Sequence, residues 1–331
     1  MRRRDFFTFV GTAAAASTLH TIAAPAQQPE RPLVGVIFSG SVDGFASRTA
    51  AFRKGLGETG FVDGKNVTVE YHALDGHYER LPGLLDDLIQ RHVAVIATPG
   101  NEPATLAAKA AGVAIPLVFG VAGDPVALGL VTSLAHPGGN ATGINFFAHE
   151  TNAKRLGLMH ELLPKASRFA VLINPTNVNS ARSTIKELDE AATALGLKVL
   201  YLNAGNSREI ADAFAAIARE KCEALFIAAD GFFGGQQTQF AMLTARDRIP
   251  ASYSARHLTE AGLLMSYGTS VTDMFRQVGI YTGSILKGTK PADLPVLQST
   301  RFEFVINLQA AHSLGLEIPP MLLARADEVI E

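Results

Sequence analysis

Short runs of apolar residues alternate along the chain with stretches in which apolar residues recur at helical spacing. In the first half the apolar runs cover residues 33–38, 93–97 and 115–121, and residues 67–71 alternate between apolar and polar positions. The clearest helical pattern between them is that of Leu81, Leu84, Leu85, Leu88 and Ile89. Strands that are apolar throughout are typical of a sheet covered on both faces. The alternation therefore predicts right-handed βαβ units and a parallel sheet.

The same order starts again in the second half. Residues 169–173 and 224–229 form apolar runs, residues 197–202 form a further predicted strand, and helical patterns lie between them. The second and third predicted strands have the same separation in both halves, from Val69 to Val95 and from Val199 to Leu225. We therefore predict an α/β fold of two Rossmann-like lobes with parallel sheets, and a first crossover within residues 139–148.

Short polar residues and glycines follow most of the predicted strands. They are Ser39-Gly40-Ser41, residues 98–101, Gly123-Asp124, residues 174–180 and Asp230-Gly231. Ligands of open parallel sheets bind at the carboxyl ends of the strands, where helix N-termini also favour an anion. The alternative is that each residue caps the helix that follows it. Taken together, the strand ends predict the wall of a binding cleft.

Sequence motifs for catalysis are absent from the chain. Gly55-Leu-Gly57-Glu-Thr-Gly60 spells GxGxxG, but it lies in a predicted helix, whereas a dinucleotide fingerprint follows a strand. His72, His77 and Glu79 fall on a predicted loop without metal-ligand spacing. We therefore expect no catalytic residue, no metal and no cofactor.

Composition and charge narrow the class of protein. The chain has 331 residues, is 47% hydrophobic and carries a formal net charge of −2. It is long enough for two domains and has no basic surface for nucleic acid. Its single cysteine, Cys222, precedes an apolar run and is expected in a core.

The first residues predict export. Arg2-Arg3-Arg4 and Phe6-Phe7 precede an alanine-rich segment and the small residues Ala24-Pro25-Ala26. This order is that of a signal peptide, cleaved here after Ala26, and the arginines resemble a twin-arginine signal. A membrane anchor is the alternative, but the segment is short of the roughly 20 apolar residues that span a bilayer. We expect a protein of the periplasm.

Several segments resemble the ABC transporter substrate-binding proteins of the periplasmic-binding-protein type I superfamily, and within it the tryptophan/phenylalanine-binding-like branch. They are AFRKGLGETGFVDGKNVTVEY, HYERLPGLLDDLI, IPLVFGVAGDPVALGLVTSLAHPGGNATGI, GLLMSYG and KPADLPVLQSTRFEFVINLQAAHSLGLEIPPMLLARADEVIE. The resemblance covers the chain from about Pro32 to Glu331. It implies capture of a small polar solute, an amino acid or related carboxylate, by a monomer that delivers it to an ABC permease in the inner membrane with its cytoplasmic ATPase.

The resemblance also implies a division into lobes joined by three crossovers. Lobe 1 comprises residues 31–145 and 268–292, lobe 2 comprises 146–267 and 293–331, and residues 1–26 are the signal peptide. The segment 272–287 is implied to return to lobe 1. Hinge strands near residues 143–145 and 266–268 are expected to absorb a ligand-dependent closure.

Ligand-facing residues are carried over from the family by position. They are Ser39, Ser41, Asn101, Asp124, Asn145, Asn177, Asn179, Asp230, Tyr253 and Tyr267. The chain departs from the family at Gly100-Asn101-Glu102-Pro103, where Gly-Thr/Ser-Pro is common, so that an acid is added at the helix start.

We expect Asp230 to pair with the amine of the ligand. The helix N-termini near Asn101 and Asn177 are expected to hold the carboxylate of the ligand. The alternative for Asp230 is a helix cap. Phe146, Phe147, Phe232 and Phe233 flank the expected cleft and are either ligand contacts or core. A periplasmic sensor of the same fold, or an exported α/β enzyme, are the alternative functions.

Overall fold

The computed structural model describes residues 31–40, 46–112, 114–146, 151–299 and 302–331. The predicted signal peptide, Ser41 and Phe147 lie outside the described residues. The α/β fold with two sheets is confirmed, and each sheet is built mainly of parallel strands. Among the described residues, no helix combines the length and the apolar character that a membrane crossing needs.

The first sheet is parallel and has the strand order β11-β5-β4-β3-β1-β2. Its strands are β1 (Leu33–Phe38), β2 (Thr68–Ala73), β3 (Val95–Pro99), β4 (Leu117–Val121), β5 (Ala141–Asn145) and β11 (Leu297–Gln298). Val34 and Val36 of β1 belong to one core cluster, and Ile37 belongs to another. Successive strand residues point to opposite faces, so the continuous apolar run supplies a core on each side.

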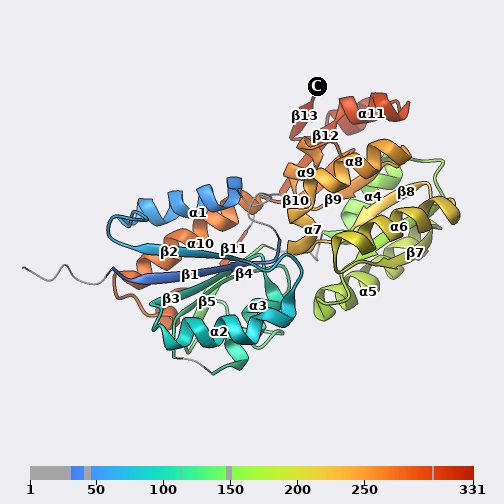
Figure 1. Cartoon of the computed structure of the whole chain (residues 1–331). Helices are drawn as coiled ribbons and strands as arrows, with labels where there is room; N and C mark the ends of the chain where they lie inside the picture. The colour runs from blue at the N-terminus through green and yellow to red at the C-terminus, as the bar shows by residue number, and fades with distance from the viewer. Residues whose placement is uncertain (1–30, 41–45, 113, 147–150, 300–301) are drawn as a thin grey trace, which may run out of the picture. The chain divides into compact units, whose positions relative to one another are not determined.

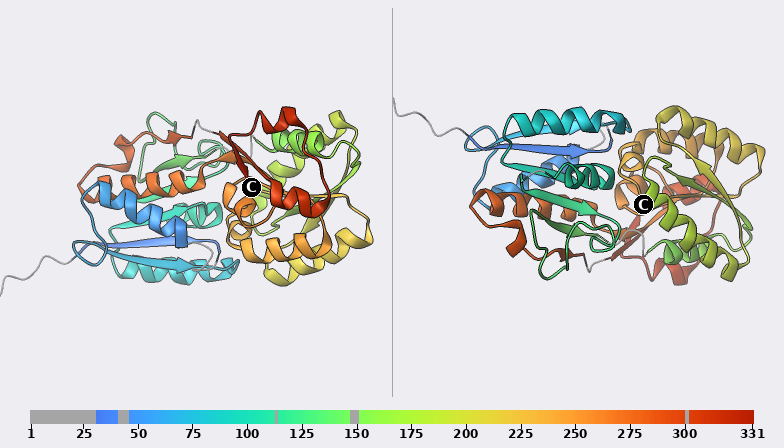
Figure 2. Two further views of the ribbon diagram at one scale, coloured as in Figure 1. Left: turned by 90° about the horizontal axis from the view of Figure 1, so that it is seen from above. Right: turned by 90° about the horizontal axis from the view of Figure 1, so that it is seen from below.

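Helices cover both faces of the first sheet. Helices α2 (Leu81–Gln90) and α3 (Glu102–Ala110) share a core cluster with Ile37, while α1 (Ala46–Glu58) and α10 (Val271–Leu286) share the cluster of Val34. Figures 1 and 2 show α10, in orange, beside α1, in blue. The two segments are far apart in sequence, and α10 returns to this sheet as the resemblance implied.

Two glycines allow this close helix packing. A Cβ on Gly55 would lie 1.9 Å from the carbonyl oxygen of Arg276, and one on Gly279 would lie 2.2 Å from that of Phe52. Any larger residue at either position would push α1 and α10 apart. Gly55 is the first glycine of the GxGxxG string, and its place inside α1 confirms that the string does not open a phosphate-binding turn.

The second sheet has the strand order β13-β12-β10-β9-β8-β6-β7. Its strands are β6 (Arg168–Ile173), β7 (Lys198–Asn203), β8 (Ala224–Ile227), β9 (Ala251–Tyr253), β10 (Met265–Thr269), β12 (Phe302–Asn307) and β13 (Glu328–Ile330). Pairing is parallel except between β10 and β12, which run antiparallel. That antiparallel pair departs from the purely parallel sheet that the apolar pattern predicted.

The helices around the second sheet are α4 (Asn152–Leu162), α5 (Val178–Leu195), α6 (Ser207–Arg219), α7 (Gly231–Gly235), α8 (Gln237–Asp247), α9 (Arg256–Glu260), α11 (Leu308–Leu314) and α12 (Pro320–Leu323). Cys222 is buried in a core cluster with Ala170 and Phe214, as its apolar surroundings predicted. Burial raises the pKa of its thiol, so the sulfur stays protonated at neutral pH.

The chain passes between the two sheets after β5, after β10 and after β11. Hydrogen bonds join these passages: Thr269 Oγ1 donates to the carbonyl oxygen of Phe146 at 2.6 Å, and the backbone N–H of Ser299 donates to that of Asn145 at 2.9 Å. Three adjacent passages of this kind are what a hinge between lobes requires.

The last passage comes later than the predicted lobe boundary at residue 293. Leu297 and Gln298 pair with Ile144 and Asn145 of the first sheet, and Val296 is buried in a core cluster of that sheet. Strand pairing therefore extends the first-sheet segment to Gln298. The sequence did not predict this extension, because a two-residue strand at a sheet edge leaves no apolar pattern. The division into moving lobes itself stays a prediction.

Candidate functional site

A small cavity lies where strands of both sheets end. The first sheet contributes Gly100 and Glu102 after β3, Gly120 to Ala122 at the end of β4, and Phe146 after β5. The second contributes Asn177 and Ser180 after β6, Ala229 to Gly231 and Gly234 after β8, and Tyr253 and Ser254 at β9. Arg48, His257, Val271 and Phe275 complete the lining from helices. This is the cleft position that the polar strand ends predicted.

The open space in the cavity is about 50 Å³. Ligand pockets are commonly about 300 Å³ or more, so the walls have to separate before a solute the size of an amino acid can enter. One close approach between the walls occurs at Gly231, where a Cβ would lie 2.3 Å from the carbonyl oxygen of Gly100. The two walls are therefore in close contact in the described structure.

Asp230 lines the cavity and caps α7. Its Oδ1 accepts hydrogen bonds from Asn174 Nδ2 at 3.0 Å and from the backbone N–H of Phe232 at 2.9 Å, and its Oδ2 accepts one from Asn177 Nδ2 at 3.0 Å. Burial raises the pKa of the carboxyl group, and these donors oppose the rise. Both oxygens thus have partners within the second sheet, which is the cap that was the alternative to an amine contact.

Tyr253 supports the same turn from β9. Its hydroxyl donates to the carbonyl oxygen of Asp230 at 2.7 Å, and burial raises the pKa of Tyr253 to about 12. Asn177 precedes α5 without a capping hydrogen bond from its side chain, and its Nδ2 donates to Asp230. Asp230, Tyr253 and Asn177 are therefore one hydrogen-bonded group, and they are the predicted site residues that line the cavity.

The other predicted residues lie near the cavity or away from it. Asn101 caps α3 through Oδ1, which accepts from the Ala104 N–H at 3.1 Å, and Asn145 donates to the carbonyl oxygen of Gly123 at 3.0 Å. Ser39 is buried at the end of β1. The exposed residues are Asp124, which caps the turn at Val126, and Asn179. Ligand contact by any of them stays a prediction.

Tyr267 does not reach the cavity. Its ring stacks on Phe302 of the antiparallel partner strand, with 6.1 Å between ring centroids, and packs in a core of the second sheet. Phe232 and Phe233 are likewise fully buried in a core, whereas Phe146 lines the cavity. The antiparallel register of β10 and β12 places Tyr267 beside Phe304, and the family position alone did not reveal that packing.

Glu102 is the acid that sets this chain apart at the start of α3. The residue is only 5% exposed and lines the cavity. Neither carboxylate oxygen has a hydrogen-bond partner of ordinary geometry among the described residues. Burial, with the charge of Asp230, raises its pKa to about 7, although polar groups of Asn179 and Gly123 nearby oppose the rise.

Arg48 and His257 form a buried pair that the sequence did not predict. Arg48, from α1, donates to the carbonyl oxygen of Gly234 at 2.6 Å, and His257 Nε2 lies next to both groups. Burial lowers the pKa of Arg48 to about 10, and burial followed by the charge of Arg48 lowers that of His257 well below its usual range. His257 is therefore neutral at physiological pH.

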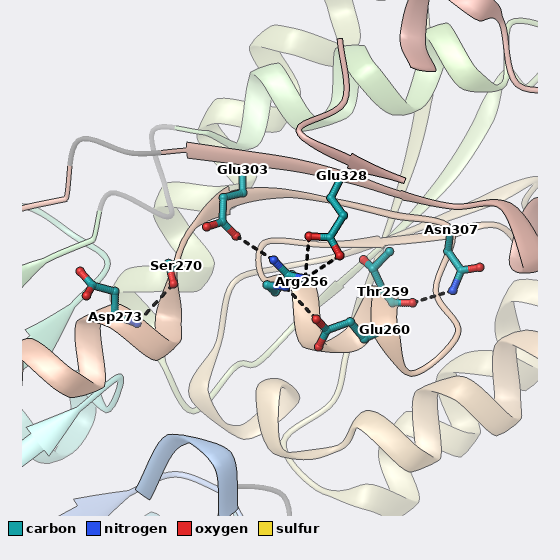
Figure 3. Close-up of polar contacts among 8 residues, drawn as sticks. All are labelled: Arg256, Thr259, Glu260, Ser270, Asp273, Glu303, Asn307 and Glu328. Carbon is teal, nitrogen blue, oxygen red and sulfur yellow. Dashed lines mark hydrogen bonds and ion pairs between the residues drawn. The ribbon is translucent and has the colours of Figure 1, made fainter. Parts of the chain in front are cut away.

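Polar contacts behind the cavity fix the two helices that carry His257 and Phe275. Arg256 of α9 binds Glu260 at 2.7 Å and Glu328 at 2.8 Å, and lies 3.7 Å from Glu303, as Figure 3 shows. Asn307 also holds α9, and Ser270 caps α10. These contacts hold His257 and Phe275 in the lining although α9 itself is short.

No group of three or more His, Cys, Asp or Glu side chains within the described ranges is arranged to hold a metal ion. His77 pairs with Glu79 at 2.8 Å, and His72 lies 3.6 Å from Glu70. The polar side chains in the cavity lining are amides, hydroxyls, two carboxyl groups, one guanidinium and the neutral imidazole of His257.

Two sheets joined by three passages, with a cavity at the strand ends between them, define a type I periplasmic binding protein. Residues 33–330 match the family described as ABC transporter substrate binding protein, and the chain belongs to that family.

Named relatives agree with this assignment. The tyrosine-binding protein of Clostridioides difficile (strain R20291) is 24% identical over 269 residues, which are 80% of this chain and 76% of the relative. A conserved domain protein of Vibrio cholerae has a similar structure, with a TM-score of 0.81, 26% identity and coverage of 91% of this chain and all of that one. An ABC domain from Streptococcus pneumonia in complex with L-Trp has a TM-score of 0.79, 24% identity and the same coverage.

Proposed function

We propose that this chain is the exported solute-binding component of an ABC import system and that it captures an amino acid. The observation that carries the proposal is the cavity whose walls come from the strand ends of both sheets, with buried polar side chains on each wall. A solute held there would be enclosed when the lobes close, and the closed form would be the one that a permease receives.

An amino acid suits the polar groups on the walls. The ammonium group can pair with carboxyl groups, and Asn, Ser and backbone groups can accept or donate the remaining hydrogen bonds. The relative from Clostridioides difficile is named for binding tyrosine, which makes aromatic amino acids the first ligands to test. Phe146 and Phe275 offer apolar contacts on the wall formed by the first sheet.

The test is a thermal-shift screen of the mature protein against the common amino acids and small carboxylates. A ligand at 100 times its Kd stabilises the folded state by about 2.7 kcal/mol, which raises the melting temperature measurably. We expect saturable stabilisation by at least one amino acid, with the compound recovered unchanged. If no amino acid stabilises the protein, this function is wrong.

The export and the partner need separate measurements. Protein recovered from the periplasm should have the intact mass of a chain that begins at Gln27, since cleavage is predicted after Ala26. Deleting the gene should abolish uptake of the radiolabelled ligand. Binding without any effect on uptake would instead point to a periplasmic sensor.

A further inference from the structure

Glu102 is a buried carboxylate without the well-formed hydrogen bonds that such a group normally has, although polar groups of Asn179 and Gly123 lie near it. It is 5% exposed, and both its oxygens are without a hydrogen-bond partner of ordinary geometry in the part of the chain that the structure describes. An unpaired buried charge is costly, and a folded protein seldom retains one without a reason. Because Glu102 lines the cavity, the missing partner can come from a bound molecule.

Charges around the cavity do not supply that partner. The cation in the lining is Arg48, and its guanidinium is engaged with the carbonyl oxygen of Gly234 and with His257. The groups that act on Glu102 are polar groups of Asn179 and of the Gly123 backbone, which are uncharged, and the charge of Asp230, a second acid on the opposite wall. Two carboxyl groups from different sheets therefore line one small cavity, and both have raised pKa values.

Asp230 differs from Glu102 in being satisfied. Its two oxygens accept hydrogen bonds from Asn174, Asn177 and backbone N–H groups. Asp230 therefore adds negative charge to the cavity, but its oxygens already have hydrogen-bond donors. Glu102 is charged when ionised, and neither of its oxygens accepts a hydrogen bond of ordinary geometry from the described residues. A solute ammonium group would supply up to three donors and a positive charge to it.

We propose that Glu102 accepts the ammonium group of the bound solute and makes this cavity selective for amines. The inference rests on the proposed function, because it concerns the solute held in the same cavity. It also reverses one expectation: the first turn of α3 carries Glu102 and is therefore not the place that holds the solute's carboxylate.

Selectivity for an amine predicts a pH dependence with a definite sign. A carboxyl group with a pKa of about 7 is mostly protonated at pH 5.5 and mostly ionised at pH 7.5, and an ammonium group binds the ionised form. Affinity for an amine should therefore rise at least ~10-fold between these pH values. The other titratable groups on the cavity wall are His257, Arg48, Tyr253 and Asp230. Over this pH range His257 stays neutral, Arg48 stays charged and Tyr253 stays protonated. Burial, with the charge of Asp230, raises the pKa of Glu102, and the pKa of Asp230 itself is also raised.

Calorimetric titrations with three probes test the inference. The probes are L-tyrosine, tyramine, which lacks the carboxylate, and 3-(4-hydroxyphenyl)propionate, which lacks the amine. The wild type should bind L-tyrosine and tyramine more tightly than the propionate. Glu102→Gln should weaken L-tyrosine and tyramine at least ~10-fold at pH 7.5 and abolish the pH dependence.

Two controls accompany the variant. Glu209→Gln changes a first-turn glutamate of α6 that is exposed and outside the cavity lining, and it should bind as the wild type does. Glu102→Gln removes an ionisation that opposes folding as pH rises from 4.5 to about 7, so the ligand-free variant should melt no lower than the wild type at pH 8.

The remaining outcomes separate the inference from the function. If the propionate binds as well as L-tyrosine, or if Glu102→Gln keeps the wild-type affinity and pH profile, the amine role of Glu102 is wrong and the function stands. If L-tyrosine and tyramine do not bind, the inference is wrong, and binding of another amino acid in the thermal-shift screen keeps the proposed function.

Discussion

At the scale of single residues, the positions of Asp230 and Glu102 at strand ends could be predicted from the sequence, but their hydrogen-bond partners could not. Asp230 follows an apolar run, and Glu102 follows a strand at the start of a helix, so the sequence placed both at strand ends. The partners of Asp230 come from Asn174 and Asn177, more than fifty positions earlier in the chain, and only the fold brings these side chains together. Arg48 and His257 lie on helices without any pattern that marks them.

Asp230→Asn should destabilise the protein, contrary to what a simple helix cap would allow. Both carboxylate oxygens accept hydrogen bonds, so an amide NH₂ in place of one oxygen would face the NH₂ of Asn177 or of Asn174. A buried group left unsatisfied costs about 1–3 kcal/mol. Urea unfolding measures the loss.

Asp124→Asn is the matched control. Asp124 also caps a turn, but it is exposed, and it caps the turn through Oδ1, which accepts a hydrogen bond from the Val126 N–H at 2.8 Å. Asparagine can keep that bond, so the change in unfolding free energy should stay within about 0.5 kcal/mol. Equal stability of Asp230→Asn and the wild type would contradict the hydrogen-bond pattern at Asp230.

At the scale of elements, continuous apolar runs made the inner strands predictable. The strands β1, β3, β4, β6 and β8 are buried on both faces apart from their first residues Leu33 and Arg168, so most residues in them carried the apolar signal. The edge strand β11 is two residues long and exposed, and the antiparallel pairing of β12 depends on a chain reversal that periodicity does not encode. The apolar pattern of the sequence predicted neither β11 nor the antiparallel pairing of β12.

The contact between α1 and α10 can be tested with two glycines of one helix. Gly55→Ala would place a methyl group 1.9 Å from the carbonyl oxygen of Arg276 and should cost about 2 kcal/mol or more, because backbone has to move. Gly57→Ala meets nothing within 4 Å and should stabilise the protein by about 0.4–1 kcal/mol through helix propensity. Denaturant midpoints of the two variants that shift in the same direction would contradict this packing.

At the scale of the whole molecule, we predict a ligand-dependent closure about the three passages between the sheets. The passages are hydrogen-bonded to one another, and the cavity is too small for an amino acid to enter unless its walls separate. Small-angle scattering should therefore show a smaller radius of gyration with a saturating ligand than without it. Identical scattering curves under both conditions would count against a hinge.

The burial of Cys222 makes the same motion accessible to spectroscopy. The chain has one cysteine, and its thiol is buried and protonated at neutral pH, so maleimide reagents will react slowly with it. Cysteines introduced at Val62 and Met242, which are 44% and 62% exposed and belong to the segments around different sheets, would accept fluorophores while the native thiol stays unlabelled. A donor–acceptor pair at these positions would turn the protein into an optical reporter of its own solute, without any need to remove the native cysteine.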